Sequence, residues 1–191
     1  MTRLALSTLA AVAALSASVA QAAPATYNID PTHTFVTFEA KHFGTSTARG
    51  RFDKKSGTIV LDKQARKGTV DITIETGSIN TGVTPFDGHL KSKDFFNSEA
   101  FPTATFKSDK LVFDGEKVTA VEGTLTLLGK SQPVTLKAEG YGCYQNPRIQ
   151  REVCGGDFAT TIQRSAYGMT YGVPNIPDDV KLVIQIEAIK Q

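Results

Sequence analysis

Three histidines are the first residues of this chain whose chemistry suggests a ligand. His33, His42 and His89 are the only imidazoles in the sequence, and a neutral imidazole can donate one hydrogen bond and accept another. No two of them have the spacing of a metal site, such as His-x-His or His-x3-His. Three roles therefore stay open: binding the polar group of a ligand, ligating a metal, or structural hydrogen bonding.

Arg164 is the fourth candidate for a polar contact. Its planar guanidinium matches the oxygens of a phosphate, but it also suits an internal ion pair. Asp30, Asp94 or another carboxylate could supply the partner. The sequence leaves both roles open.

Motifs of catalysis are absent. The chain has no Gly-x-Ser-x-Gly elbow, no His-Glu-x-x-His helix and no phosphate-binding glycine loop. We therefore predict a protein that is not an enzyme and needs no metal or other cofactor.

The first 22 residues have the pattern of a secretory signal peptide. Arg3 gives a positive start, an apolar run follows from Leu4 to Ala20, and small residues flank a cleavage position after Ala22. Removing 22 of the 191 residues leaves 169, the size of one domain, and lowers the formal net charge from +2 to +1. We predict a signal peptide over residues 1–22 and one exported domain over residues 23–191.

Both cysteines, Cys143 and Cys154, lie in the predicted exported domain. An even cysteine count in an oxidising compartment favours a disulfide. Asn146-Pro147 is a turn signal between them, so the two residues can face each other across a hairpin. We predict a structural disulfide.

Charge gives no sign of a nucleic-acid partner. No basic run is longer than the pairs Lys54-Lys55 and Arg66-Lys67, which suit solvated loops. After the predicted leader, no apolar stretch is long enough to span a bilayer. We predict a domain that is soluble after cleavage.

Apolar residues alternate with polar ones at period two through most of the chain, which indicates half-buried strands. Shorter candidates are residues 58–61, 104–107 and 111–113. About eight strands in one domain suit a closed antiparallel barrel, since closure removes exposed edges; a two-sheet sandwich is the alternative. The clearest alternating faces are Val36/Phe38/Ala40/His42, Val70/Ile72/Ile74, Val121/Gly123/Leu125/Leu127, Val134/Leu136/Ala138, Phe158/Thr160/Ile162 and Leu182/Ile184/Ile186/Ala188.

One segment breaks the alternation. Thr84 can cap a helix that begins at Pro85, and Asp87 would sit in its first turn, where a negative charge suits the helix dipole. The segment continues to Pro102. We predict one or two short helical turns that cover a side or an end of the barrel.

Four blocks of sequence follow one another in a characteristic order. They are residues 30–34 with 41–44 (DPTHT, KHFG), 89–96 (HLKSKDFF), 123–129 with 133–136 (GTLTLLG, PVTL), and 164–169 (RSAYGM). Together they resemble the YceI-like family of polyisoprenoid-binding periplasmic proteins. The resemblance implies an all-β, eight-stranded, lipocalin-like barrel whose interior takes a long isoprenoid lipid.

The chain departs from the family pattern in two places. Phe86-Asp87 stands where many members carry Arg-Asp, and the segment 141–156, which holds both cysteines, is not general in the family. The chain also has no Trp, so the Gly-x-Trp signature of true lipocalins is absent. The resemblance is to their architecture.

Apolar side chains alone could hold such a lipid. Each buried methylene contributes about 0.8 kcal/mol, so one isoprene unit contributes roughly 3–4 kcal/mol before ordering costs. Micromolar affinity needs only about 8 kcal/mol. We predict that His33, His42, His89 or Arg164 contacts the head group. We predict that the tail is bound by Val36, Phe38, Ile72, Ile74, Phe86, Phe95, Phe96, Phe106, Leu125, Leu127, Leu136 and Ile184.

The sequence thus predicts a periplasmic carrier that sequesters an isoprenoid lipid, a quinone or a polyprenyl phosphate, in an apolar tunnel. Transient membrane contact is compatible with this function, and the protein would be a monomer or a homodimer. The alternative is a barrel with a filled interior that acts as a stress or protein-interaction module without a lipid.

Overall fold

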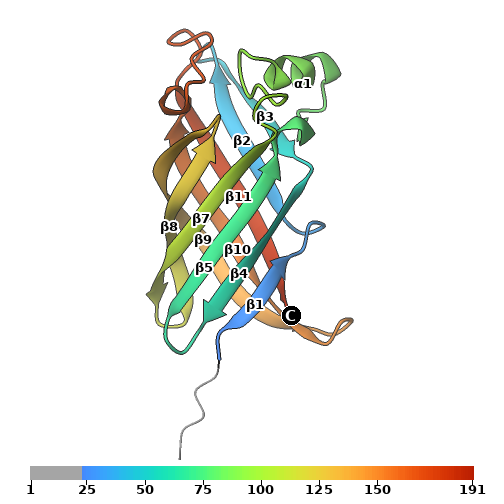
Figure 1. The fold of residues 1–191 in the computed structure, drawn as a ribbon, viewed down its shortest axis with the longest axis vertical. Helices are drawn as coiled ribbons and strands as arrows, with labels where there is room; N and C mark the ends of the chain where they lie inside the picture. The colour runs from blue at the N-terminus through green and yellow to red at the C-terminus, as the bar shows by residue number, and fades with distance from the viewer. Residues whose placement is uncertain (1–22) are drawn as a thin grey trace, which may run out of the picture.

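Eight antiparallel strands close into a barrel in the computed structural model, which describes residues 23–191 (Figure 1). Strand β11 pairs back with β1, which closes the ring and confirms the predicted fold class. The ring order is β1 (Ala25–Ile29), β4 (Lys55–Asp62), β5 (Lys67–Glu75), β7 (Thr103–Asp114), β8 (Lys117–Leu127), β9 (Lys130–Asn146), β10 (Arg151–Gln163) and β11 (Asp179–Lys190).

Three further strands extend the wall at one end: β2 (Phe35–His42), β3 (Ser46–Phe52) and β6 (Ile79–Asn80). Strand β2 pairs with the first half of β11, whereas β1 pairs with its last residues, so β1 and β2 follow each other along β11. Thr34 lies between them, only 1 % exposed. Its hydroxyl donates to the carbonyl of Glu187 and accepts from the amide of the same residue. This side chain thus satisfies backbone groups where the ladder is interrupted.

The helix α1 (Thr84–Lys91) lies across one end of the barrel, which we call the α1 end (Figure 1). The predicted cover is present, but the predicted cap is wrong. The N-cap is Val83, which makes no side-chain cap bond, and Thr84 is already helical. Asp87 instead accepts hydrogen bonds from the amide and hydroxyl of Thr81, at 2.7 and 2.6 Å. The carboxylate fixes the loop that leads into the helix.

At the opposite end, a disulfide joins Cys143 and Cys154, as predicted. The two residues are direct partners on β9 and β10, and their Cα atoms are 4.1 Å apart. We call this the disulfide end. The segment 141–156 is therefore a cross-linked extension of the β9–β10 hairpin.

Side chains fill the interior toward the disulfide end. Tyr27, Val153 and Ala188 are no more than 2 % exposed there. The Tyr27 hydroxyl donates to Glu152 at 2.5 Å, and Lys63 pairs with the same carboxylate at 2.6 Å. Burial, and then the Glu152 carboxylate, raise the pKa of Tyr27 well above its ordinary value. These contacts close this end, so the interior is not a tunnel with two openings.

Residues 1–22, which carry the predicted signal peptide, lie outside the described residues. Within residues 23–191 no helix is long and apolar enough to cross a bilayer. The 3-10 turns η1 (Thr76–Ser78) and η2 (Arg164–Tyr167) complete the described elements.

Candidate ligand cavity

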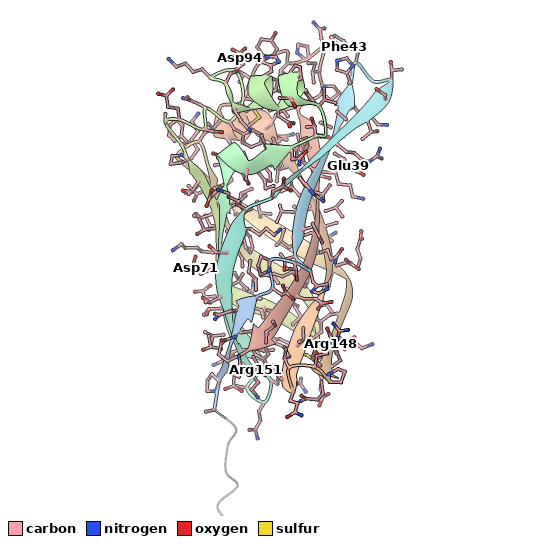
Figure 2. The ribbon with its side chains drawn as sticks, turned by 90° about the vertical axis from the view of Figure 1, so that its right-hand side faces the viewer. Glu39, Phe43, Asp71, Asp94, Arg148 and Arg151 are labelled. Atoms are coloured by element: carbon pink, nitrogen blue, oxygen red, sulfur yellow. A yellow bond between two sulfur atoms is a disulfide. The ribbon has the colours of Figure 1, made fainter. Side chains whose placement is uncertain are left out.

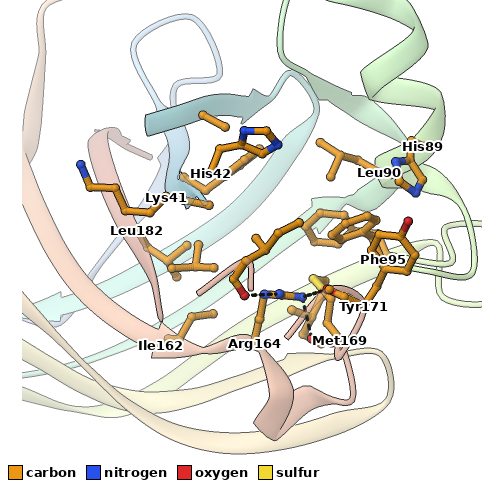
Figure 3. A pocket seen from close by; sticks show the side chains of 18 of the residues that line it. Lys41, His42, His89, Leu90, Phe95, Ile162, Arg164, Met169, Tyr171 and Leu182 are labelled. Carbon is orange, nitrogen blue, oxygen red and sulfur yellow. Dashed lines mark hydrogen bonds between the residues drawn. The ribbon is translucent and has the colours of Figure 1, made fainter. Parts of the chain in front are cut away.

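The barrel holds a cavity of about 650 Å³ in the half nearer α1 (Figure 3). Its volume falls within the roughly 300–1,000 Å³ of small-molecule sites. Apolar residues from the inward faces of β2, β3, β5, β7, β8, β10 and β11 form its walls, and residues of the α1 segment form its cover. Exposed residues, among them Lys41, Phe43 and Tyr171, also line it. The cavity therefore opens at the α1 end.

The residues predicted to bind a lipid tail divide into two groups. Eight line the cavity: Val36, Phe38, Ile74, Phe86, Phe95, Phe96, Leu125 and Leu127. Four do not: Ile72, Phe106, Leu136 and Ile184. Ile72 and Ile184 lie two residues beyond the cavity-lining Ile74 and Leu182 on the same strand faces. Period-two alternation identifies the inward face of a strand but not the depth at which the cavity ends.

Small residues create the space near the opening. Ala40 on β2 and Ala48 on β3 are direct cross-strand partners, and both line the cavity. Ala104 on β7 lines it as well. Alternation places Ala40 on an inward face, but a small side chain gives no signal in the sequence that it borders a cavity.

Contacts between aromatic rings connect the barrel wall to the cover. Phe38 packs against Phe52 with ring centroids 6.3 Å apart, and Phe52 meets Phe96 edge-on at 5.4 Å. Gly50 makes room for this arrangement, because a Cβ atom there would lie 2.5 Å from the Phe38 ring. Such edge-to-face contacts are favourable between aromatic quadrupoles. They hold the segment after α1 against the wall.

Two of the three histidines lie at the cavity. His42 and His89 line it, whereas His33 does not. The His89 ring meets those of Phe95 and Tyr171 edge-on, at 5.0 and 5.3 Å, and forms the mouth cluster with them (Figure 3). Its Nε2 atom lies 3.2 Å from Asp94.

His33 bonds to Asp30 through Nδ1 at 2.7 Å, on the outside of the barrel. This contact raises the pKa of His33. Burial raises the pKa of Asp30, but hydrogen bonds from His33 and Thr32 outweigh it and lower the value to about 2. His33 therefore has a structural partner away from the cavity.

A metal site made of the histidines is not formed among residues 23–191. One group of three ligand-type residues does occur there, Cys143, Glu152 and Cys154. Its two sulfur atoms are bonded to each other, so it offers no thiolate.

Arg164 is buried, at 3 % exposure, and lines the cavity; it forms no ion pair with any residue of 23–191. Its guanidinium donates to four backbone carbonyls, those of Met169, Tyr171, Ile176 and Pro177, at 2.9–3.2 Å. Of the ion-pair partners considered, Asp30 and Asp94 bond to histidines instead, and the carboxylate near Arg164 is Asp178.

Burial lowers the pKa of Arg164, and the nearby Asp178 opposes this shift. Asp178 itself accepts from the amide and hydroxyl of Ser165, at 2.8 and 2.5 Å. Arg164 and Asp178 together fix residues 168–178, which we call the wall loop. This loop contains no helix or strand, so its sequence has no apolar periodicity that would identify it. Its residues Met169, Tyr171 and Ile176 line the cavity.

A closed antiparallel barrel with a blind apolar cavity and a helical cover defines a protein of the lipocalin-like barrel class. Residues 27–188 match the YceI-like domain family. The chain belongs to the YceI-like family, as the four sequence blocks indicated.

Individual relatives agree with this assignment. A UPF0312 protein of Pseudomonas aeruginosa is 35 % identical over 189 residues, covering 96 % of this chain and 98 % of the relative. The crystal structure of a Campylobacter jejuni YCEI protein superposes with a TM-score of 0.70 at 31 % identity, over 79 % of this chain and 90 % of that one.

A polyisoprenoid-binding domain from Saccharophagus degradans shares the fold at a TM-score of 0.65 and 19 % identity. The match covers 86 % of this chain and 98 % of that domain. At this identity the likeness concerns the fold alone.

Proposed function

We propose that this protein sequesters and carries an isoprenoid lipid, with the lipid tail in the cavity and the head group at the α1 end. The observation that carries the proposal is the cavity of about 650 Å³, whose walls are almost wholly apolar. The filled-barrel alternative requires an interior without such a space. A blind apolar cavity suits a lipid that enters tail first, because the closed inner end of the cavity is apolar.

The mouth cluster and His42 supply the polar contacts for a head group. Imidazole nitrogens and the Tyr171 hydroxyl can donate to a carbonyl oxygen. Arg164 already gives four of its five N–H donors to backbone carbonyls. Since its donors are largely used, we favour an uncharged acceptor of the quinone type over a polyprenyl phosphate.

The family and the fold support a lipid-binding role. The Saccharophagus degradans domain of the same fold is described as polyisoprenoid-binding. The predicted leader and the disulfide are compatible with export to an oxidising compartment, and we propose the periplasm as the site of action. We propose a passive function, without catalysis.

The direct test is native mass spectrometry of protein purified gently from the periplasm, followed by solvent extraction and lipid identification. We expect one isoprenoid lipid per chain, with a quinone head. A polyprenyl phosphate would overturn the head-group assignment alone. Protein without lipid, which also takes up none when prenyl lipids are added, would overturn the carrier function.

A cavity-filling variant sharpens this test. Ala48→Phe places a ring inside the cavity, and we expect at least an about tenfold weaker uptake of prenyl lipid, equal to about 1.4 kcal/mol. Ala120→Phe is the matched control, because Ala120 lies on β8 outside the cavity. Equal uptake by both variants would show that the lipid does not occupy this cavity.

A further inference from the structure

Of the six large apolar side chains exposed in residues 23–191, four lie at the α1 end, and two, Tyr144 and Ile149, lie at the disulfide end. Phe43, Val83, Tyr171 and Val173 are 60, 55, 47 and 36 % exposed; we call them the rim residues. Phe43 and Tyr171 line the cavity itself. They come from three separate segments: the β2–β3 turn, the residue before α1, and the wall loop. The rim residues therefore bring apolar groups from separate segments to the α1 end.

Phe43 is the least expected of them. It occupies a tight turn with φ of 48°, followed by Gly44 at 71°. Turns of this kind favour Asn, Asp or Gly, and a bulky residue at positive φ is strained. Here the chain instead carries a large aromatic side chain at the α1 end, which is mostly exposed and meets the His42 ring edge-on with centroids 4.7 Å apart (Figure 2). Neither the turn nor the core explains this choice.

The charges beside the rim suit a lipid surface. Lys41, Lys91 and Lys93 form no ion pair within residues 23–191, although acidic residues also lie there: Asp94, and Glu39, which bonds to Arg49 and also attracts Lys41. Aromatic rings with a polar tip, such as Tyr171, favour the boundary between acyl chains and head groups. Unpaired lysines add attraction to anionic lipids.

We propose that the α1 end docks reversibly on a phospholipid bilayer, with the rim residues inserted at the level of the head groups. The inference rests on the proposed function: an isoprenoid tail is costly to expose to water, so a carrier gains by opening its cavity directly onto the bilayer. Docking places the mouth against the phase in which such a lipid dissolves. The tail then passes between membrane and barrel with little exposure.

The test uses the absence of Trp from the chain. Phe43→Trp and Tyr144→Trp each introduce a single tryptophan. Tyr144 is the matched control, an aromatic residue 49 % exposed on the β9–β10 hairpin at the disulfide end. The vesicles contain phosphatidylcholine and phosphatidylglycerol and no isoprenoid. Circular dichroism first confirms that each variant is folded.

We expect vesicles to shift the emission of the Phe43→Trp variant to shorter wavelength, and brominated lipids to quench it. The Tyr144→Trp variant should show neither effect. A combined Phe43→Ser and Tyr171→Ser variant should bind vesicles at least about tenfold more weakly. No shift for Phe43→Trp, or equal shifts at both ends, would overturn the docking proposal. A shift without vesicles, together with a dimer in sedimentation, would instead assign the rim to a second copy of the chain.

The carrier function and the membrane docking can be refuted independently of each other. Uptake of a prenyl lipid from solution, measured by native mass spectrometry, tests the cavity without a membrane. Uptake without vesicle binding would refute docking and leave the carrier function standing. Vesicle binding without uptake would refute the carrier function.

Discussion

Replacing Arg164 by Met should strongly destabilise the protein, because one buried guanidinium supports the whole wall loop. Each hydrogen bond from a charged donor contributes roughly 1.5–3 kcal/mol, and Arg164 makes four such bonds. The simple sum overstates the loss, since freed carbonyls can turn to water and the guanidinium no longer has to be desolvated. We expect Arg164→Met to lower the free energy of unfolding by about 4 kcal/mol, near the upper end for a point mutation.

Arg164→Lys tests whether geometry or charge matters. An ammonium group keeps the charge but has three donors and no planar fork, so it cannot reach all four carbonyls together. We expect a loss of about 2 kcal/mol. This variant also keeps the test usable if Arg164→Met does not fold, because whole domains are stable by only about 5–15 kcal/mol.

Urea unfolding measures both losses, and hydrogen exchange locates them. Residues 168–178 should exchange faster in both variants, while β4 and β5, across the ring from β10 and β11, keep their protection. Losses below about 1 kcal/mol with unchanged exchange in the wall loop would refute this account of Arg164.

Three further predictions concern groups away from the cavity. Reduction of the Cys143–Cys154 disulfide, which spans 11 residues, should cost roughly 3 kcal/mol of stability in urea unfolding, with lipid uptake unchanged; a large fall in uptake would contradict the separation of the two ends. For His33, the raised folded pKa means that its stabilising contribution is complete below the ordinary value of 6.5 and declines as pH rises through the raised value. The difference in unfolding free energy between the wild type and His33→Gln should therefore shrink from pH 6 upward, and a difference that grows with pH would refute the assignment. Asp30 behaves oppositely: its lowered pKa stabilises the fold above pH 3.8, and this contribution is lost as pH falls toward 2.

The barrel could be predicted from the sequence because the alternation of apolar and polar residues in each strand indicates which face points inward. Val70, Ile72 and Ile74 are all buried, as their alternation with polar residues requires. The disulfide followed equally from local information, namely two cysteines on either side of a turn. Strand alternation and the spacing of the two cysteines can both be recognised from residues that are close together in the sequence.

The extent of the cavity could not be predicted in this way. Whether Ile72 or Ile74 meets the empty space depends on which residues of other strands fill the barrel at that level. The wall loop was missed for a related reason: its carbonyls are held by a side chain and not by a strand partner, so no periodic pattern marks it. Arg164 itself was found, but four backbone oxygens as partners leave no trace in the sequence.

Both ends of the described chain meet at the disulfide end, where Tyr27 on β1 pairs with Lys190 on β11 (Figure 1). Only Ala23 and Pro24 separate β1 from the predicted cleavage position. A leader left uncut in the membrane would therefore tether the disulfide end of the barrel and hold the α1 end, where the cavity opens, away from that bilayer. Cleavage at the predicted position would then do more than complete export, because it would let the barrel reorient with its mouth toward the bilayer.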